Sequence, residues 1–186
     1  MADINWAADA GSTLSGSATV SSGSIVGTYP LCFDEDFGTI YKCDCGIGAQ
    51  GTATSTMTIR SVFAKPVTIS RLRSYWMVYT SSGDHSVPAP SYSMNIKYRI
   101  GAAWTTATTL SGGAANSDPI DTDLTGLSIE GVDAVEWNGY ATGSGYRYPM
   151  FPYFIVPGIA IQGCYELQAY GSIKGGVNPI FFGANT

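Results

Sequence analysis

An acidic loop carries the residues whose types and spacing could do chemistry. The segment LCFDEDFGTIY places oxygen-bearing side chains at Asp34, Asp36 and Thr39 between two apolar flanks. Calcium takes six to eight oxygens from carboxylates, hydroxyls and backbone carbonyls, and a short curled loop can supply such a mixture. Glu166, the one acid in the apolar segment IAIQGCYELQAY, is the candidate for a further carboxylate. The alternative is that the two aspartates only solvate a turn.

Aromatic side chains gather in a second stretch, WNGYATGSGYRYPMFPY. Its Gly and Pro residues indicate a loop, and exposed rings next to a few hydrogen-bond donors are what a sugar site requires. The candidate ligand-binding residues are Tyr140, Tyr146, Arg147, Tyr148, Phe151 and Tyr153, which Tyr29 and Trp104 could join. The same rings could instead cap a core or lie in a subunit interface, where Tyr, Trp and Arg are also enriched.

Catalytic residues are hard to find in this sequence. The single histidine, His85, follows an aspartate in a serine-rich loop, but a triad is defined by geometry rather than by closeness in sequence. Paired carboxylates for glycoside hydrolysis could be drawn from Asp118, Asp121, Asp123, Glu130, Asp133 and Glu136, and nothing selects a pair. We therefore expect a protein that is not an enzyme.

Length and composition restrict the class of protein. A chain of 186 residues is most economically one domain. The 23 glycines and only 12% charged residues suit short strands joined by polar turns. A formal net charge of -5 disfavours a nucleic-acid ligand, which needs clustered Lys and Arg. We find neither a secretory signal nor an apolar run long enough to span a membrane, so the sequence predicts a chain kept in a cytoplasm or a piece of a secreted protein.

Alternating apolar and polar residues predict several strands. The clearest covers 92–100, and others are expected over 56–63, 67–79, 130–141 and 155–170. Turn-rich stretches separate them at 46–55, 81–91, 111–126 and 141–152. No amphipathic helix of ten or more residues is indicated. Many strands joined by glycine-rich turns predict an all-β fold, an antiparallel sandwich or jelly roll.

The order and spacing of these segments resemble the discoidin-type (coagulation-factor C-type) family of galactose-binding-like jelly rolls. The chain resembles that family's opening at SATVSS, its acidic loop at CFDED through TIY, and the following strands at STMTI and KPVTISRL. The stretch YELQAYG is similar to the family's closing motif. Together these blocks span 17–171, which is the domain that the resemblance implies.

The resemblance also implies a calcium ion that staples the fold and does no chemistry. Its ligands would be the Leu31 carbonyl, Asp34, Asp36, Thr39, the Tyr165 carbonyl and Glu166. The sequence departs from the family at two positions, where Glu35 stands in place of a glycine and Tyr41 in place of a tryptophan. A glutamate does not easily adopt the positive φ that a glycine allows.

Four cysteines leave further possibilities open. They lie at 32, 43, 45 and 164, a spacing that does not suit a zinc site. A Cys32–Cys164 bridge is conceivable if calcium brings the loop and the closing motif together. The alternative is that both are small buried hydrophobic residues.

Function is predicted from the resemblance and from the ends of the chain. We expect an extended arm over 1–16 and a tail over 172–186 that carries Ile180, Phe181 and Phe182, and exposed apolar residues of this kind invite association. The first hypothesis is a homo-oligomeric structural protein of a phage-like virion, a decoration or tail appendage, that contacts other virion proteins and attaches to cell-surface glycans. The alternative is a carbohydrate-binding module from a secreted glycan-active protein, and a hydrolase comes third.

Overall fold

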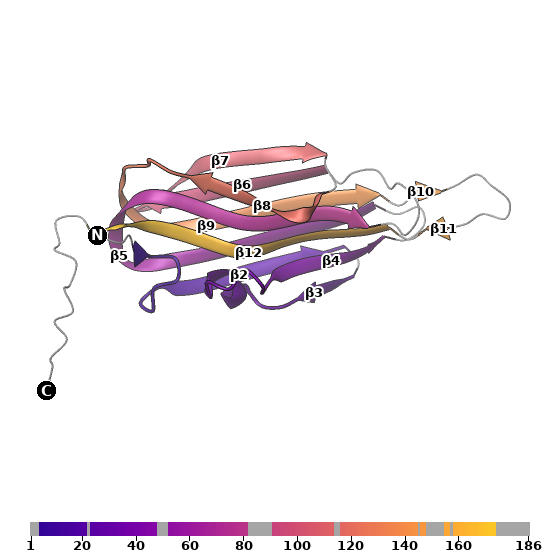
Figure 1. Cartoon of the computed structure of the whole chain (residues 1–186), viewed down its shortest axis with the longest axis horizontal. Coiled ribbons are helices and arrows are strands. Elements are labelled where there is room, and N and C mark those ends of the chain that lie inside the picture. Colours follow the sequence, from indigo (N-terminus) through magenta and orange to yellow (C-terminus); the bar gives the residue numbers. More distant parts are fainter. Residues whose placement is uncertain are drawn as a thin grey trace, which may run out of the picture.

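Antiparallel strands make up nearly all of the structure, a computed structural model (Figure 1). It describes residues 4–21, 23–47, 52–81, 91–113, 116–144, 146–147, 155–156 and 158–173. The one helix in these ranges is a short 3-10 turn, η1 (Tyr29–Phe33). No helix in the described part of the chain is long and apolar enough to cross a membrane.

Two layers of strands share the long strand β5 (Thr52–Ser81). The first half of β5 lies in the order β2–β5–β9–β6–β7, with β2 (Thr13–Val20), β9 (Ile129–Ser144), β6 (Ser91–Ile100) and β7 (Ala103–Gly113). Its second half lies in the order β3–β4–β12–β5–β8, with β3 (Ser24–Val26), β4 (Tyr41–Ile47), β12 (Gly158–Ser172) and β8 (Asn116–Leu124). We call these the first and second sheets. β1 (Ile4–Asn5) pairs with the end of β12, and β10 (Tyr146–Arg147) pairs with β11 (Ile155–Val156).

The passage of β5 from one sheet to the other follows from its sequence. Its register with β9 shifts between Val62 and Val67, and the three residues between Phe63 and Val67 are exposed. Pro66 has no N–H to donate to a ladder, so regular pairing is interrupted at this position. The chain can therefore bend here while the strands on either side stay paired.

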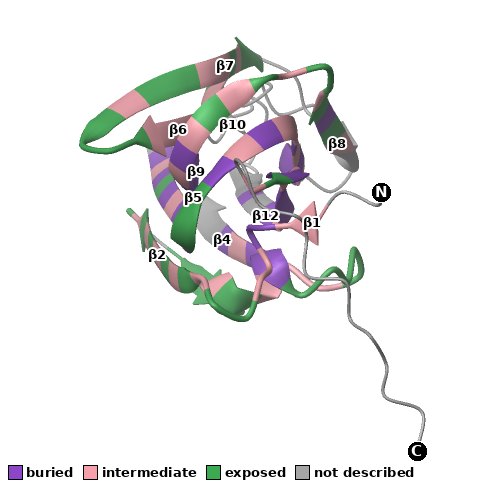
Figure 2. Cartoon of the chain, turned by 90° about the vertical axis from the view of Figure 1, so that its left-hand side faces the viewer, coloured by how far each residue is buried: buried purple, intermediate pink, exposed green. Residues whose placement is uncertain are grey.

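The core lies between the two sheets. Met57 and Ile59 point inward from the first sheet and Leu72 and Trp76 from the second, and all four are at most 2% exposed. The rings of Trp76 and Trp137, from opposite sheets, lie 6.5 Å apart. Figure 2, turned toward the end of the sandwich, shows buried and more exposed positions alternating along its strands. The antiparallel β-sandwich predicted from the sequence is therefore confirmed.

Most predicted strands are present, and strands also occupy the described parts of three stretches predicted as turns, 46–55, 111–126 and 141–152. The segment 92–100 lies in β6, 130–141 in β9, and both 56–63 and 67–79 lie in β5. The prediction of a turn-rich stretch over 111–126 is wrong, because it contains β8, whose polar residues face arginines of β5. β2 and β7, rich in Ser and Thr, were not predicted as strands.

The ends of the chain are described in part. Residues 4–5 and 13–16, which the sequence assigned to an arm, pair with β12 and β5 as part of the sandwich. At the other end, β12 continues to Ser172, and the predicted tail beyond Ile173 lies outside the described residues. At Gly171 a Cβ would lie 1.9 Å from the carbonyl oxygen of Thr68, so this closing glycine allows β12 to approach β5.

Candidate functional site

The acidic loop lies against a bulge in β12. η1 leads into the loop, and Cys32 and Phe33 at its end are buried in the core. The register between β12 and β5 shifts between Cys164 and Glu166, which makes Tyr165 an extra residue in β12. A bulge of this kind re-aims the side chains beside it. The loop and the bulge together bring several of the predicted calcium-binding residues close to one another.

Several oxygen atoms crowd around the Thr39 side chain in the loop. The hydroxyl of Thr39 lies 2.9 Å from Oδ2 of Asp34, 3.0 Å from the carbonyl oxygen of Asp36 and 3.4 Å from that of Leu31. A hydroxyl has a single proton to donate. Three acceptors therefore converge on a group that can fully satisfy only one of them, an arrangement that suits a cation.

Glu166 is the most deeply buried acid of the described residues. It is 1% exposed, and neither oxygen of its carboxyl group makes a hydrogen bond of good geometry, although the Asp34 carboxyl and the Glu35 backbone lie near it. Burial, followed by the nearby carboxyl of Asp34, raises the pKa of Glu166 to about 8. A buried polar group without a partner is costly and calls for an explanation, such as an ion.

The predicted ligands are brought together to different degrees. Asp34, Thr39, Glu166 and the Leu31 carbonyl converge, whereas the Asp36 carboxylate accepts from the N–H of Gly38. Asp36 therefore faces the other oxygens through its carbonyl group rather than its side chain. The ring of Tyr165 packs on the ring of Tyr75, with their centroids 5.4 Å apart. Tyr165 is the extra residue of the bulge, so its backbone carbonyl is the atom of this residue to consider as a ligand.

The donor set fits calcium better than a softer metal. No group of three or more His, Cys, Asp or Glu residues gathers anywhere in the described ranges, so a site of zinc type is not present there. Two carboxyl groups, one hydroxyl and backbone carbonyls are the hard oxygen donors that calcium prefers. Cys32 and Cys164, which flank this oxygen cluster in sequence, are free buried thiols, and the Cys32 thiol donates to the Cys164 carbonyl at 3.3 Å.

Glu35 adopts the left-handed backbone conformation that a glutamate was not expected to adopt easily. Its φ is +60°, the left-handed region that a glycine enters freely. The side chain of Asn5 donates to Oε1 of Glu35 at 3.0 Å and accepts from the backbone N–H of Ala169 at 3.1 Å. This bridge to β12 helps to hold the left-handed Glu35 in place.

A second candidate site lies on the solvent side of the first sheet, which we call the polar face. The pairing register aligns outward side chains in rows across the strands. Ser17 of β2, Thr58 of β5, Asn138 of β9 and Asn95 of β6 form one such row. The next row holds Ser15, Arg60, Glu136 and Lys97, and the row on the other side holds Thr19, Thr56, Tyr140 and Ser93.

A hydrogen-bonded network fixes the middle of the polar face. Glu136 is 4% exposed although it points away from the core. Nε and Nη2 of Arg60 donate to one of its oxygens, and the amide of Asn138 donates to the other at 2.7 Å, where Lys97 lies 3.6 Å away. The guanidinium of Arg60 lies 4.9 Å from the ring of Trp104. These contacts hold Arg60 in one position.

Only part of the predicted aromatic site falls within the described residues. Tyr140 stands on the polar face and is 44% exposed. Tyr146 and Arg147 are the two residues of β10. Tyr148, Phe151 and Tyr153 lie outside the described residues, and so does His85. The polar face itself was not predicted, although the Ser and Thr repeat in β2 was a signal for it.

Four of the six acids considered for hydrolysis are held by arginines. Asp121 pairs with Arg73, Asp123 with Arg71 and Asp133 with Arg99, each at 2.6 Å, and Glu136 pairs with Arg60. The arginine at Asp123 holds the pKa of that carboxyl below its usual value. These pairs cross-link neighbouring strands, and the expectation that the chain is not an enzyme stays a prediction.

Comparisons with known proteins return solved structures alone. No protein-family model matches the chain, and no curated protein matches its sequence. It is similar to CBM32-3 from a family 31 glycoside hydrolase of Clostridium perfringens (13% identity, 91% of this chain and 95% of that one, TM-score 0.48) and to a family 32 CBM of the same organism in complex with galactose (9%, 91% and 98%, 0.43). It is also similar to an F5/8 type C domain from Bacteroides fragilis (16%, 89% and 99%, 0.36). Each of these solved structures shares 16% identity or less with this chain.

Replacing Glu35 should separate backbone strain from side-chain bonding. Glu35→Ala loses the Asn5 hydrogen bond and keeps the positive φ, whereas Glu35→Gly loses the same bond and removes the strain. Because a left-handed residue other than glycine costs roughly 1–2 kcal/mol, we expect Glu35→Gly to be about 1 kcal/mol more stable than Glu35→Ala. Urea denaturation of both variants measures the difference. Equal stabilities would contradict the left-handed conformation at this position.

The raised pKa of Glu166 predicts a pH dependence in a chelator. The pKa rises from an ordinary 4.5 to about 8 in the folded chain. Between these values the folded chain binds more protons than the unfolded chain, so its stability should fall as the pH rises from about 5 to about 8. Urea denaturation at several pH values checks this, with Glu166→Gln as the control, which should have a flatter profile. Parallel profiles would show that Glu166 titrates normally.

Proposed function

We propose that this protein is a non-catalytic, calcium-stapled β-sandwich module that binds glycans. The observation that carries the calcium part is Glu166, a buried carboxyl whose two oxygens have no partner and which faces Asp34. The glycan part rests on the polar face, where Tyr140 stands exposed among fixed donors and acceptors. A module of this kind agrees with the alternative function drawn from the sequence, a carbohydrate-binding module from a secreted glycan-active protein. The virion role and the homo-oligomer stay predictions.

The proposed calcium ion joins the loop to β12. Its ligands would be carboxylate oxygens of Asp34 and Glu166, the hydroxyl of Thr39, and the carbonyls of Leu31, Asp36 and Tyr165. Six oxygens satisfy the lower limit of calcium coordination. The two carboxylates would neutralise the charge of the ion, and the positive charge would in turn let Glu166 ionise inside the protein. Bound calcium would then stabilise the fold and keep the loop in place.

Glycan recognition would use the polar face together with the aromatic segment that follows Tyr140. A sugar needs a flat apolar surface for its C–H groups and polar groups that are already in position for its hydroxyls. The exposed ring of Tyr140 and the neighbouring Thr56, Thr58 and Asn138 offer both. Secretion as part of a glycan-active protein is the localisation that goes with this role.

Thermal unfolding tests the calcium staple. We expect calcium to raise the melting temperature of the wild type relative to the same protein in chelator, by the equivalent of about 2.7 kcal/mol at a hundred times the Kd. Asp34→Asn should respond much less, because it keeps the Oδ1 that accepts from the Asp36 N–H but loses the charge. Asp133→Asn, which changes the net charge equally on the other sheet, is the matched control and should respond like the wild type.

Two further measurements make the calcium result decisive. Elemental analysis of the purified protein detects metal that the chelator leaves bound. Magnesium, which demands a smaller and more regular shell, should give a weaker shift than calcium. If the wild type carries no metal and its melting temperature ignores calcium, the staple is excluded and the acidic loop is only a turn.

A glycan array tests the binding function. The full chain should bind a limited set of glycans, and Tyr140→Ala should weaken that binding roughly tenfold or more, because stacking and burial at one aromatic ring contribute about 1–2 kcal/mol. Phe37→Ala is the matched control, since Phe37 is also an exposed ring, 39% exposed, but lies in the acidic loop. Its binding should be unchanged. If the wild type binds no glycan on the array, the proposed glycan-binding function is wrong.

A further inference from the structure

We propose that a hollow on the polar face, between β2 and β5, holds one neutral pyranose and recognises it by a pair of adjacent hydroxyl groups. The inference rests on the proposed glycan-binding function. It adds a second binding position beside Tyr140 and names the sugar groups that this position recognises. The hollow measures about 240 Å³ and is lined by Ser15, Gly16, Ser17, Thr58 and Arg60. Drug-sized ligands occupy pockets of roughly 300–1,000 Å³, so this hollow suits a single ring.

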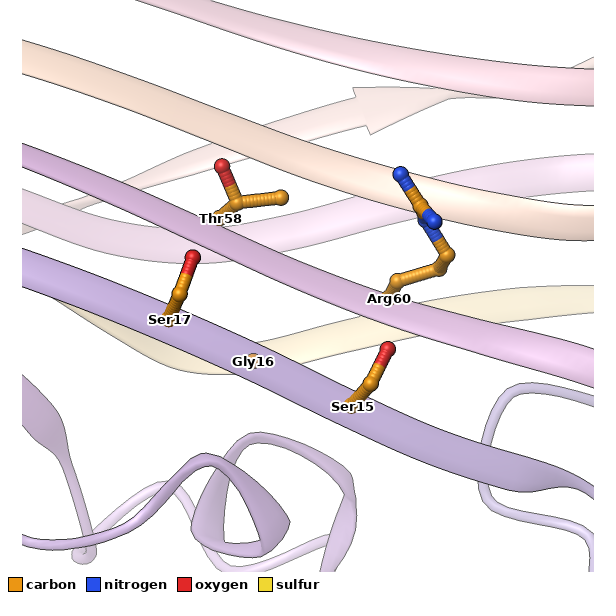
Figure 3. A pocket seen from close by; sticks show the side chains of 5 residues that line it. All are labelled: Ser15, Gly16, Ser17, Thr58 and Arg60. Atoms are coloured by element: carbon orange, nitrogen blue, oxygen red, sulfur yellow. The ribbon is translucent and has the colours of Figure 1, made fainter.

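Polar groups of the hollow point to the same side of the sheet. Figure 3 shows the hydroxyls of Ser15, Ser17 and Thr58 and the guanidinium of Arg60 projecting from two neighbouring strands. Their alignment follows from the register, which pairs Ser15 with Arg60 and Ser17 with Thr58. Ser15 and Ser17 have no hydrogen-bond partner among the described residues, so each hydroxyl can donate and accept.

The network beneath the hollow decides which of its groups donate and which accept. Thr58 donates its only hydroxyl proton to Oδ1 of Asn138 at 2.9 Å, so its oxygen is left as an acceptor. Arg60 uses Nε and Nη2 on Glu136, and its remaining N–H groups are donors. An acceptor beside a donor matches two adjacent hydroxyls of a sugar, one of which donates while the other accepts.

The pairing of Arg60 favours a neutral ligand. Arg60, the cation that lines the hollow, is paired with the buried carboxylate of Glu136, which is shared with Lys97 and Asn138. An anionic sugar would have to compete with Glu136 for Arg60. Because the same contacts and Trp104 already fix Arg60, little side-chain entropy remains to be lost when a ligand binds.

Tyr140 links the hollow to the rest of the proposed glycan surface. It follows Asn138 by two residues on β9 and so lies on the same face, about 7 Å further along the strand. Its ring is exposed next to Thr56. A sugar in the hollow would therefore be able to continue toward Tyr140, and the two places would bind neighbouring rings of one glycan.

NMR titration of the full chain with three methyl glycosides, of β-galactose, β-glucose and α-mannose, tests the inference. We expect at least one to shift the backbone amides of residues 15–17 and 58–60. Ser15→Ala/Ser17→Ala should weaken that binding about tenfold, since each hydrogen bond to a neutral hydroxyl is worth roughly three- to tenfold. Thr13→Ala, an exposed hydroxyl on the same strand beyond the hollow, is the matched control and should bind like the wild type.

Thr58→Val gives a second variant that removes an acceptor. It should weaken binding by a similar factor, and its melting temperature checks that the fold survives the loss of the bond to Asn138. The serine variants remain the primary test, because both serines are exposed and make no bond that the fold requires.

Failure of the hollow and failure of the glycan function give different results. If none of the three glycosides moves the amides at the hollow, or if the serine variants bind as the wild type does, the hollow is not a sugar subsite. The array result with Tyr140→Ala then decides the glycan function by itself. A wild type that is silent in both experiments overturns both.

Methyl galacturonate, which carries a free carboxylate, tests whether the hollow binds neutral rather than anionic sugars. Its affinity should match that of methyl galactoside within about threefold and should hardly change with salt, because the guanidinium of Arg60 is already paired with Glu136. A preference for the uronate of about tenfold or more that disappears at high salt would show that Arg60 is free to bind anions, and it would overturn the assignment to neutral sugars.

Discussion

One continuous strand, β5, constrains the whole sandwich. Its first half pairs with β2 and β9, and its second half pairs with β12 and β8. The two sheets are therefore joined both by the backbone of β5 and by its hydrogen bonds. The bend before Val67 sets the angle at which the two layers face each other, and the packing of Trp76 against Trp137 fills the space between them. Because inward and outward residues alternate along a strand, β5 also supplies the outward Thr58 and Arg60 of the polar face. The core and the proposed binding surface are therefore two sides of the same strand.

The acidic loop depends on this frame through β12. β12 pairs with the second half of β5, and the bulge at Tyr165 interrupts that pairing beside the loop. A regular strand would place Glu166 in strict alternation with its neighbours, whereas the extra residue changes the direction of the side chains on either side of it. η1 anchors the loop from the other side through Cys32 and Phe33, which are buried. The oxygen cluster thus lies where two buried elements meet, with the buried Glu166 on its inner side and the exposed Asp34 and Asp36 on its outer side.

The sequence was most informative where burial imposes a period. Alternation indicated β6 and β9 because one side of each strand lies in the core, and the spacing of Asp34, Thr39 and Glu166 indicated the residues that converge at the loop. It was least informative for β8, where Asp121 and Asp123 are matched by Arg73 and Arg71 of β5 rather than by apolar neighbours. A repeat of acids facing a repeat of arginines can be recognised only when the pairing of strands is known. The left-handed Glu35 was missed for a related reason, since its support comes from Asn5, thirty residues away.

A comparison of two buried glutamates is the basis for proposing a cation at the acidic loop. Glu136 is 4% exposed and Glu166 is 1% exposed, so both must offset the cost of leaving water. Glu136 does so with Arg60, Lys97 and the amide of Asn138. Around Glu166 the nearby groups are instead another acid, Asp34, and the oxygens that compete for the one proton of Thr39. A proton can relieve Glu166 alone, which is the state that its raised pKa describes, while the other loop oxygens share the N–H groups of Asp36 and Thr39 and the Thr39 hydroxyl. A divalent cation relieves all of them at once, and calcium accepts the irregular mixture of carboxylate, hydroxyl and carbonyl that this loop provides.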